Sequence, residues 1–195
     1  MKKLAKDSKT KENLMKAFAG EGMARNRYTY FASRAKKEGY EQISSIFLET
    51  ADNEKEHAKI FFKFLGEDFK SVEINKIAYP AGLSEYTEKN LKFAASGEHE
   101  ENSILYPSFE KTAREEGYME IADNIHEIIE VEIIHEKRYL DLLDILKEDK
   151  VFKRENEVIW KCRNCGYHYK GKEAPALCPA CKHPIAYFEV YTENY

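Results

Sequence analysis

Apolar side chains recur at helical spacing along most of the first three quarters of the chain. The pattern predicts four amphipathic helices, at about 11–38, 41–65, 84–116 and 118–147, with the third starting near Ser84 or Thr87. The apolar face of the first helix is formed by Leu14, Phe18, Tyr28, Phe31 and Ala35. Thr10 is expected to cap this helix, because a threonine hydroxyl can accept a hydrogen bond from a free amide of the first turn.

Glycines and one long connection divide the helical pattern. Gly39, Gly66 and Gly117 each follow a predicted helix, where a glycine commonly ends it. Residues 66–83 show no periodicity and include Pro80. Such a long connection is unusual in a compact domain, but a crossover between two helix hairpins needs one. The predicted fold is therefore mostly α, a ferritin-like four-helix bundle over residues 1–147.

The two halves of this region repeat each other. A shift of 78 residues pairs Tyr28 with Tyr106, Phe31 with Phe109, Ala35 with Ala113, Gly39 with Gly117 and Ile43 with Ile121. Before Tyr28 the match slips: Glu21 falls on His99, and one inserted residue would bring it to Glu98. The region is an internally duplicated helix hairpin.

The duplication carries a Glu-x-x-His motif in each half. Glu54 and His57 lie in the first half, and the same shift places them on Glu132 and His135. Residues three apart project from one face of a helix, so each motif presents a carboxylate beside an imidazole. Two such motifs, with single glutamates on the other two helices, are how a bundle holds a carboxylate-bridged dimetal site.

Single glutamates with suitable spacing lie on the other two helices. Glu21 is on the first, and Glu98 and Glu101 are on the third. Tyr28 follows Glu21, and Tyr106 follows Glu98, at offsets that return to the same helical face, so each tyrosine can hydrogen-bond a ligand carboxylate. Oxygen-rich ligation with few imidazoles favours iron or manganese over zinc or copper.

Chance is the alternative to a metal site, because glutamate is abundant and most such motifs are solvated helix surface. Against chance, Glu132 stands among apolar neighbours, and a buried carboxylate is costly unless it is paired or metal-bound. Polar residues without a mirrored partner are interpreted as ordinary ones: His99, His126, Glu56 and Glu100.

The composition changes after residue 147. Residues 148–157 form a charged linker that leads toward a strand, and residues 158–195 are rich in cysteine, glycine, proline and aromatic side chains. A domain this short cannot bury a sufficient apolar core, so it is expected to depend on a metal.

The tail contains all four cysteines. They form two Cys-x-x-Cys pairs, Cys162 with Cys165 and Cys178 with Cys181. Four thiolates in a tetrahedral array bind iron or zinc. The adjacent bundle and the aromatic residues favour iron, although the spacing also permits a structural zinc ribbon, and disulfides are a further alternative. His168 and His183 flank the pairs and are not expected to be ligands.

Charge and hydropathy exclude several functions. The net charge is −4, which argues against nucleic acid as the main partner, because phosphate binding needs a clustered basic surface. No apolar run is long enough for a membrane span, and no signal-peptide core follows the basic N-terminus, so a cytoplasmic location is expected. No GxGxxG element is present, so NAD(P)H is not expected to bind this chain directly.

These motifs together resemble rubrerythrin over essentially the whole chain. The segments that carry the resemblance are Glu21-Gly-Met-Ala-Arg-Asn-Arg-Tyr28, Glu54-Lys-Glu-His57, Ala94-Ala-Ser-Gly-Glu98-His-Glu-Glu101, Ala113-Arg-Glu-Glu-Gly-Tyr118, His135-Glu-Lys-Arg-Tyr139 and the rubredoxin-like tail Cys162-Arg-Asn-Cys165-Gly-Tyr with Cys178-Pro-Ala-Cys181. The tail is C-terminal, as in ordinary rubrerythrins.

The resemblance implies a ligand set for two iron ions and one further iron at the four cysteines. Glu54 and Glu132 would bridge the two irons. The terminal ligands would be Glu21 on the first iron, and Glu98 and His135 on the second.

The resemblance also implies a redox switch at the first iron. Glu101 would be a movable ligand that binds this iron when it is oxidised, and His57 would replace it on reduction. Beyond the resemblance, Glu101, once displaced by His57, is our candidate for relaying protons, with Tyr28 and Tyr106 beside the ligands.

The implied activity is that of a non-haem di-iron peroxidase, which reduces hydrogen peroxide to water in oxidative-stress defence. Electrons would come from rubredoxin or an NAD(P)H-dependent reductase and pass through the four-cysteine iron, in a homodimer. Zinc can replace iron at either site during purification. Two other interpretations stay open: a ferroxidase or iron-storage protein of the ferritin-like class, and a zinc-binding interaction protein.

Overall fold

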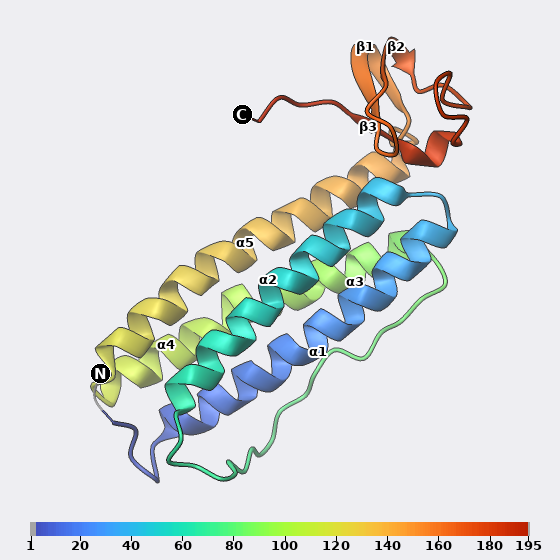
Figure 1. The fold of residues 1–195 in the computed structure, drawn as a ribbon. Coiled ribbons are helices and arrows are strands. Elements are labelled where there is room, and N and C mark those ends of the chain that lie inside the picture. Colours follow the sequence, from blue (N-terminus) through green and yellow to red (C-terminus); the bar gives the residue numbers. More distant parts are fainter. Residues whose placement is uncertain (1–2, 195) are drawn as a thin grey trace.

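A long helical bundle carries a small β domain at one end (Figure 1). The structure is a computed structural model and describes residues 3–194. Its helices are α1 (Lys9–Lys37), α2 (Glu41–Leu65), α3 (Thr87–Glu100), α4 (Tyr106–Glu115) and α5 (Met119–Lys147), with a π-helical segment, η1 (Glu101–Leu105), between α3 and α4. The predicted mostly α, ferritin-like bundle is confirmed.

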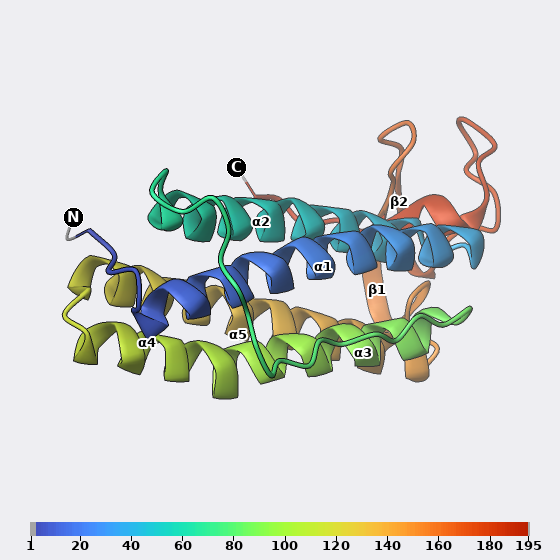
Figure 2. The ribbon, with the colours of Figure 1, turned by 90° about the horizontal axis from the view of Figure 1, so that it is seen from below.

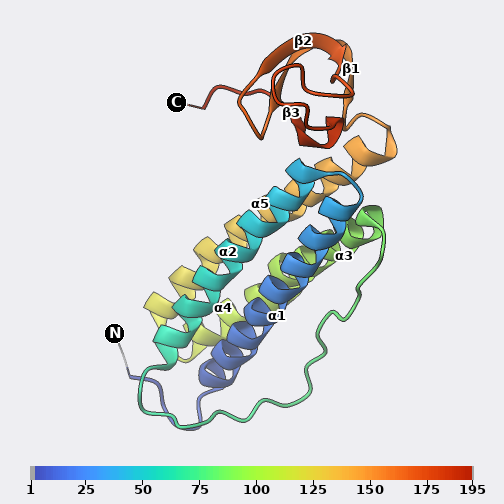
Figure 3. The same cartoon turned by 45° about the vertical axis from the view of Figure 1, so that its right-hand side comes forward.

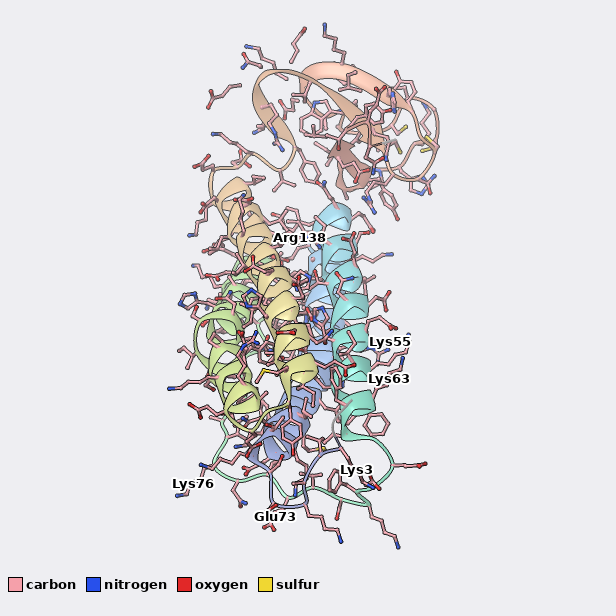
Figure 4. All side chains as sticks on the ribbon, turned by 90° about the vertical axis from the view of Figure 1, so that its left-hand side faces the viewer. Lys3, Lys55, Lys63, Glu73, Lys76 and Arg138 are labelled. Carbon is pink, nitrogen blue, oxygen red and sulfur yellow. The ribbon has the colours of Figure 1, made fainter. Side chains whose placement is uncertain are left out.

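The two predicted hairpins pack against each other within one chain. One consists of α1 and α2, and the other of α3, η1 and α4 with α5 (Figures 1 and 3). Charged side chains occupy outward positions, as Lys55 and Lys63 on α2 do, which point away from the bundle (Figure 4). No helix within residues 3–194 combines the length and the apolar character that a membrane span requires.

A polar layer divides the apolar core of the bundle into two clusters. One cluster, toward the chain's N-terminus, is built around Leu14, Phe61, Tyr106 and Ile121. The other, toward the β domain, is built around Tyr28, Phe31, Phe47, Leu91 and Tyr139. Buried glutamates and histidines fill the layer between them. The bundle therefore places its only extensive buried charge, within the described residues, at mid-length between two apolar clusters.

The duplication is visible in how the helices end. Gly39 and Gly117 follow α1 and α4 with φ of +86° and +78°, the left-handed conformation that glycine adopts without strain. The next amide closes the same bond in both halves: Tyr40 N donates to Ala35 O at 2.9 Å, and Tyr118 N to Ala113 O at 2.8 Å. Glycine was correctly predicted to end these helices.

The first helix begins differently from the prediction. Its N-cap is Ser8, whose hydroxyl oxygen accepts a bond from Lys11 N at 3.0 Å, so the assignment of this role to Thr10 is wrong. Thr10 lies inside the first turn, and its hydroxyl donates to a carboxylate oxygen of Glu116 at 2.6 Å. The cap could not be chosen from sequence alone because both residue types cap helices and the partner of Thr10 is remote.

Each hairpin supplies a carboxylate to the start of the other. Glu116, after α4, accepts bonds from the backbone amides of Lys9 and Thr10 at 2.9 Å. Glu38, after α1, accepts bonds from the amide and hydroxyl of Thr87 at the start of α3. A carboxylate at a helix N-terminus satisfies free amides and opposes the positive end of the helix dipole. These two contacts join the hairpins at the start of α1 and at the start of α3.

The predicted third helix is interrupted rather than continuous. In η1, Tyr106 N bonds to Glu101 O, five residues earlier, instead of four. A π-helical turn accommodates one extra residue. The repeat needs such a residue here, because seven positions separate Glu21 from Tyr28 and eight separate Glu98 from Tyr106. The inserted residue predicted from the slipped match is therefore the π-helical turn.

The crossover connects the end of α2 to the start of α3 and passes over the outside of α1 (Figure 2). It lets α2 and α3 run in the same direction, as one long crossover in a four-helix bundle requires. Its amide at Asn75 and its hydroxyl at Tyr79 bond to Glu12 and to Lys16 O on α1, at 3.4 and 2.9 Å.

The β domain is a three-stranded antiparallel sheet in the order β2-β1-β3. The strands are β1 (Lys153–Cys162), β2 (His168–Glu173) and β3 (Phe188–Val190), with a short helix, η2 (Ile185–Tyr187), before β3. β1 begins within the span 148–157 predicted as a linker, so part of that span is strand. Trp160 fills the small core, and its Nε1 donates to Gly171 O at 3.0 Å.

The β domain rests on the end of the bundle where α1 turns into α2 (Figure 3). The Tyr40 ring stacks on the Phe152 ring with centroids 6.2 Å apart. Gly39 lies close to Ala186, since a Cβ on this glycine would be 3.6 Å from the alanine Cβ. The turn of the first hairpin is therefore also the platform for the tail.

Candidate metal centres

The polar layer brings together the glutamates and histidines that the sequence singled out. Six of these residues come from four helices: Glu21 from α1, Glu54 and His57 from α2, Glu98 from α3, and Glu132 and His135 from α5. All six are buried. Helical spacing aims them inward because each lies between apolar residues of its own helix that face the core.

The six residues form two overlapping groups. In the first group, donor atoms of Glu21, Glu54, His57 and Glu132 lie within 4.8 Å of one another. The second group, with the same spacing, consists of Glu54, Glu98, Glu132 and His135. Glu54 and Glu132 belong to both groups, which is the arrangement expected when two carboxylates bridge two cations.

The two histidines lie symmetrically across this layer. His57 Nδ1 is 2.9 Å from Glu54 Oε2 and 2.8 Å from Glu132 Oε1. His135 Nδ1 is 2.8 Å from Glu132 Oε2 and 3.2 Å from Glu54 Oε1. The ring centroids are 6.0 Å apart, so both imidazoles point Nδ1 at the shared carboxylates.

Two buried carboxylate oxygens, Glu21 Oε2 and Glu98 Oε2, have no hydrogen-bond partner, and two more, Glu54 Oε1 and Glu132 Oε1, are approached only by the Nδ1 atoms of His135 and His57. A buried unpaired carboxylate oxygen is costly, and a directly bound cation removes the cost. One such oxygen, unpartnered or facing only an imidazole, comes from each of the four glutamates in the two groups. The donor set therefore fits a pair of oxygen-preferring cations, with one imidazole for each.

Tyr28 and Tyr106 hold ligand carboxylates of the opposite hairpin. The Tyr28 hydroxyl on α1 donates to Glu98 on α3, and the Tyr106 hydroxyl on α4 donates to Glu21 on α1. Burial, with the neighbouring carboxylates, raises the pKa of both phenols well above the ordinary value. Both tyrosines therefore stay protonated and keep donating, which fixes the orientation of each glutamate.

Burial sets the electrostatics of the terminal carboxylates. It raises the pKa of Glu21, Glu98 and Glu101 well above the ordinary value, and the charges of Glu132 and Glu54 add to this shift. The layer therefore disfavours a full set of uncompensated carboxylate charges.

In the two histidines, the hydrogen bonds and charges of nearby carboxylates together have a larger effect on the pKa than burial has. Burial lowers their pKa, but hydrogen bonds to Glu132 and Glu54 outweigh it and raise the pKa of His57 to about 10 and that of His135 to about 9. The layer thus attracts positive charge, in the form of protons or of metal ions.

Glu101 stands apart from both groups. It lies in η1 and is only partly buried, and one of its oxygens would be 3.7 Å from a Cβ placed on Gly20. The guanidinium of Arg27, which the sequence did not single out, lies nearby across Gly97 and partly offsets the raised pKa of Glu101. Arg27 Nε and Nη1 are buried without a hydrogen-bond partner.

The residues interpreted as ordinary stay outside the layer. His99 and His126 are exposed and lie 3.0 and 3.3 Å from Glu136 and Glu110. Glu56 pairs with Lys59 at the surface. Glu100 is half-buried and belongs to neither ligand group.

The four cysteine sulfurs converge in the β domain. Cys162 and Cys181 Sγ are 3.7 Å apart, as are Cys165 and Cys178 Sγ, and all four lie within 4.8 Å of one another. No disulfide joins them. These separations suit four thiolates around one metal ion rather than the predicted alternative of disulfides.

Two equivalent turns hold the cysteine pairs. Gly166 N donates to Cys162 O at 2.8 Å, and Lys182 N donates to Cys178 O at 2.9 Å. The backbone amide of His183 and the neighbouring thiols lower the pKa of Cys181 to about 6, which favours the thiolate that binds metal. The His183 and His168 rings pack on Tyr187 and Tyr191, and neither is in the sulfur group.

Comparison with known proteins identifies the family. The family model described as rubrerythrin matches residues 12–143, and the model described as the rubredoxin-like domain of rubrerythrin matches residues 160–189. The chain belongs to the rubrerythrin family. It is 58% identical to a rubrerythrin of Clostridium perfringens, covering 99% of this chain and 100% of the relative, and 53% identical to a rubrerythrin of Nitratidesulfovibrio vulgaris, covering 99% and 100%.

Solved structures give the same architecture. A structure described as the fully reduced, all-ferrous state of nigerythrin matches with a TM-score of 0.63 and 33% identity, covering 96% of this chain and 92% of that one. An engineered Archaeoglobus fulgidus ferritin matches with a TM-score of 0.61 at 16% identity, covering 74% and 87%, which shows the shared fold. This rubrerythrin-family chain thus carries donor sets for two iron ions in the bundle and one in the tail.

Proposed function

We propose that this protein is a hydrogen peroxide reductase of the di-iron type, supplied with electrons through its four-cysteine iron. The observation that carries the proposal is the pair of ligand groups that share Glu54 and Glu132, in one chain with a four-sulfur site. Two ferrous ions held by these residues would supply both electrons for the conversion of one peroxide and two protons to two waters. A two-electron reduction avoids release of a hydroxyl radical.

The residues around the layer would orient the ligands and handle protons. Tyr28 and Tyr106 fix Glu98 and Glu21 through hydrogen bonds from opposite hairpins. Glu101 would relay the protons, because it has a raised pKa, it is partly exposed, and it borders the ligand layer.

The placement of His57 and Glu101 supports the predicted ligand exchange. His57 belongs to the first ligand group, and Glu101 belongs to neither group. His57 would therefore be the residue that holds the first iron when the iron is reduced, with Glu101 at the border of the layer. The exchange would place Glu101 on the first iron when that iron is oxidised.

The electron route supports a homodimer. The turn at Tyr40 bears the β domain, and Glu54 lies fourteen positions further along α2, which corresponds to about 20 Å along the helix. A tail that approaches the bundle of a second copy would shorten this route. The external donor would be rubredoxin or an NAD(P)H-dependent reductase, and the same chemistry would serve oxidative-stress defence in the cytoplasm.

The two centres can be tested separately. Glu132→Ala should remove a shared ligand, reduce bundle iron and lower peroxide consumption with a reduced donor by about three orders of magnitude or more. Cys162→Ser should leave one single-turnover oxidation of the ferrous bundle intact while it abolishes steady turnover. Undiminished turnover in Glu132→Ala would contradict the proposal.

Iron storage predicts a different result. A storage protein would form a large hollow oligomer and accumulate many ferric ions per chain. A dimer by size-exclusion chromatography, with at most three irons per chain, would exclude storage. A zinc-binding interaction protein would be colourless, whereas ferric iron bound by four thiolates is red.

A further inference from the structure

The crossover lies near Glu101, at the border of the ligand layer. It passes outside α1 between the end of α2 and the start of α3 (Figure 2). The Tyr79 hydroxyl donates to Lys16 O on α1 at 2.9 Å, and the amide of Asn75 makes a longer bond to Glu12, at 3.4 Å. Tyr79 therefore ties the middle of the crossover to the bundle.

A small cavity lies beneath Tyr79 and reaches a predicted ligand. Its volume is about 20 Å³, and its wall includes Tyr79, Gly20, Gly97, Glu101 and Tyr106. A space of this size holds about one water molecule. Two neighbouring hollows under the same segment, beside Arg27 and beside Phe93, are bordered by none of the predicted ligands.

Gly20 brings Tyr79 and Glu101 together. A Cβ on Gly20 would be 3.5 Å from Tyr79 Cε1 and 3.7 Å from Glu101 Oε1. The aromatic ring and the carboxylate thus approach α1 at the same point, where the absence of a side chain leaves room. Burial raises the pKa of Tyr79, and the charge of Glu101 contributes, which agrees with their proximity.

We propose that Tyr79 is a specificity-determining residue that closes the peroxide entrance beside Glu101 and limits it to substrates near the size of water. The inference rests on the proposed peroxidase function. Hydrogen peroxide has two heavy atoms and fits the entrance with a small movement of the ring. An alkyl hydroperoxide carries a bulky apolar group that the cavity beneath Tyr79 cannot hold. The crossover side chain, rather than the ligands, would thus select the substrate.

The ring and the hydroxyl of Tyr79 have separable roles. Tyr79→Ala removes the ring and opens the cavity. Tyr79→Phe keeps the ring and removes only the bond to Lys16 O. Leu83→Ala is the matched control, because Leu83 lies on the same segment, is 56% exposed and does not line this cavity.

The first measurement is the ratio of kcat/KM for tert-butyl hydroperoxide to that for hydrogen peroxide. We expect Tyr79→Ala to raise this ratio by about tenfold or more, Tyr79→Phe to raise it a few-fold, and Leu83→Ala to leave it unchanged. Iron content and melting temperature, measured on every variant, identify a variant that has simply lost its fold. In that case Tyr79→Phe alone carries the test.

The second measurement needs no turnover. It is the rate at which 2,2′-bipyridine extracts ferrous iron from the bundle, which we expect to rise several-fold in Tyr79→Ala and not in Leu83→Ala. If Tyr79→Ala changes neither the iron-extraction rate nor the kcat/KM ratio, the proposed role of Tyr79 is overturned. Equal increases of these quantities in Tyr79→Ala and Leu83→Ala would overturn it as well. If the wild-type protein loses its iron slowly to 2,2′-bipyridine but does not reduce peroxide, that result would instead overturn the peroxidase proposal.

Discussion

The two hairpins of the bundle carry equivalent residues at equivalent positions and differ at one helical turn, η1. Each contributes a terminal glutamate, a Glu-x-x-His motif, a buried tyrosine and a carboxylate that caps the other hairpin. Before η1 the halves are related by 77 residues, as in Glu21 and Glu98, and after it by 78, as in Tyr28 and Tyr106. The repeat therefore supplies equivalent residues to both sides of the ligand layer, and one inserted residue in the second hairpin makes the backbone of the two sides different.

The inserted residue changes the environment of one position in particular. Counted with the 77-residue relation, Glu101 corresponds to Ala24, which is buried in the apolar cluster beside Tyr28. The regular helix of the first half places a fully buried methyl group there. The wider π-helical turn of the second half holds a carboxylate that is partly exposed. The asymmetry of the proposed redox exchange thus has a backbone origin.

Metal removal should affect both hairpins and have the largest effect on stability. Glu21 and Glu98, one from each hairpin, have a raised pKa, as do His57 and His135, at about 10 and 9. A raised pKa stabilises the folded chain at low pH, and this contribution is lost as pH rises through the folded-state value. Iron-free protein should therefore melt at least about 10 °C lower at pH 9 than at pH 6.

Iron replaces the bound protons, so the melting temperature of the iron-loaded protein should not decrease in this way between pH 6 and pH 9. Differential scanning calorimetry of both forms at the two pH values tests the expectation. The matched control is Glu56→Gln, at a surface glutamate outside the layer, which should follow the wild type in both forms. Parallel pH dependence in iron-free and iron-loaded protein would show that the layer does not exchange protons for metal.

Deletion of Ser103 should make the halves alike and cost activity. Ser103 is exposed in the middle of η1, and its removal gives Glu98 and Tyr106 the seven-residue spacing of Glu21 and Tyr28. The first half shows that a regular helix can present both groups at this spacing. We expect two irons per bundle to remain while peroxide turnover falls by about 100-fold, because Glu101 loses its wider turn.

Iron analysis and steady-state assays on the same preparation separate the two effects. Substitution of Ser103 by alanine keeps the residue count and serves as the control, with turnover close to wild type. Full activity in the deletion variant would mean that the π-helical turn does not matter for the reaction. If the deletion variant loses iron, the π-helical turn is instead needed to position the metal ligands.

Local pattern and repetition were enough to predict which glutamates and histidines lie together in the buried layer. Glu54 and Glu132 were recognised because a duplicated motif is improbable by chance, and the slipped match between Glu21 and Glu98 located an inserted residue. The structure adds that this residue forms a π-helical turn, which changes a hydrogen-bond pattern without changing the helical periodicity that the sequence displays.

Contacts between remote segments could not be predicted in the same way. Ser8 and Thr10 are both plausible N-caps, and the choice depends on Glu116, which is more than 100 positions away. The position of Tyr79 beside Glu101 depends on the path of a connection without periodicity. Such contacts follow from how the hairpins dock, which local propensity does not determine.

The two capping glutamates should contribute similar stability, since the repeat gives them equivalent roles. Glu116→Gln and Glu38→Gln each weaken charge-assisted bonds to a helix N-terminus of the other hairpin. We expect each to cost about 1–2 kcal/mol, or a few degrees in Tm, with nearly additive losses in the double variant. Glu115→Gln, beside Glu116 but exposed, is the control. A large difference between the two capping variants would show that the hairpins are not docked symmetrically.

The smallest effect is expected at an ion pair that has no counterpart in the repeat. Arg138 on α5 reaches α2, where its Nη1 is 3.1 Å from Glu49 Oε1 and 3.4 Å from Thr50 Oγ1 (Figure 4). The position related to Arg138 by the repeat is Ile60, so the contact joins the hairpins on one side only. Exposed pairs of this kind are worth less than about 1 kcal/mol. Arg138→Met should therefore lower Tm by at most about 2–4 °C.

High salt distinguishes this contact from simple loss of packing, because it screens exposed ion pairs but not apolar contacts. The Tm difference between Arg138→Met and the wild type should shrink in about 1 M salt. Lys137→Met is the matched control, because Lys137 pairs with Asp141 on the same helix and joins no hairpins. If both variants lose the same small amount, the hairpins are held by the caps and the ligand layer, which are the features that both halves share.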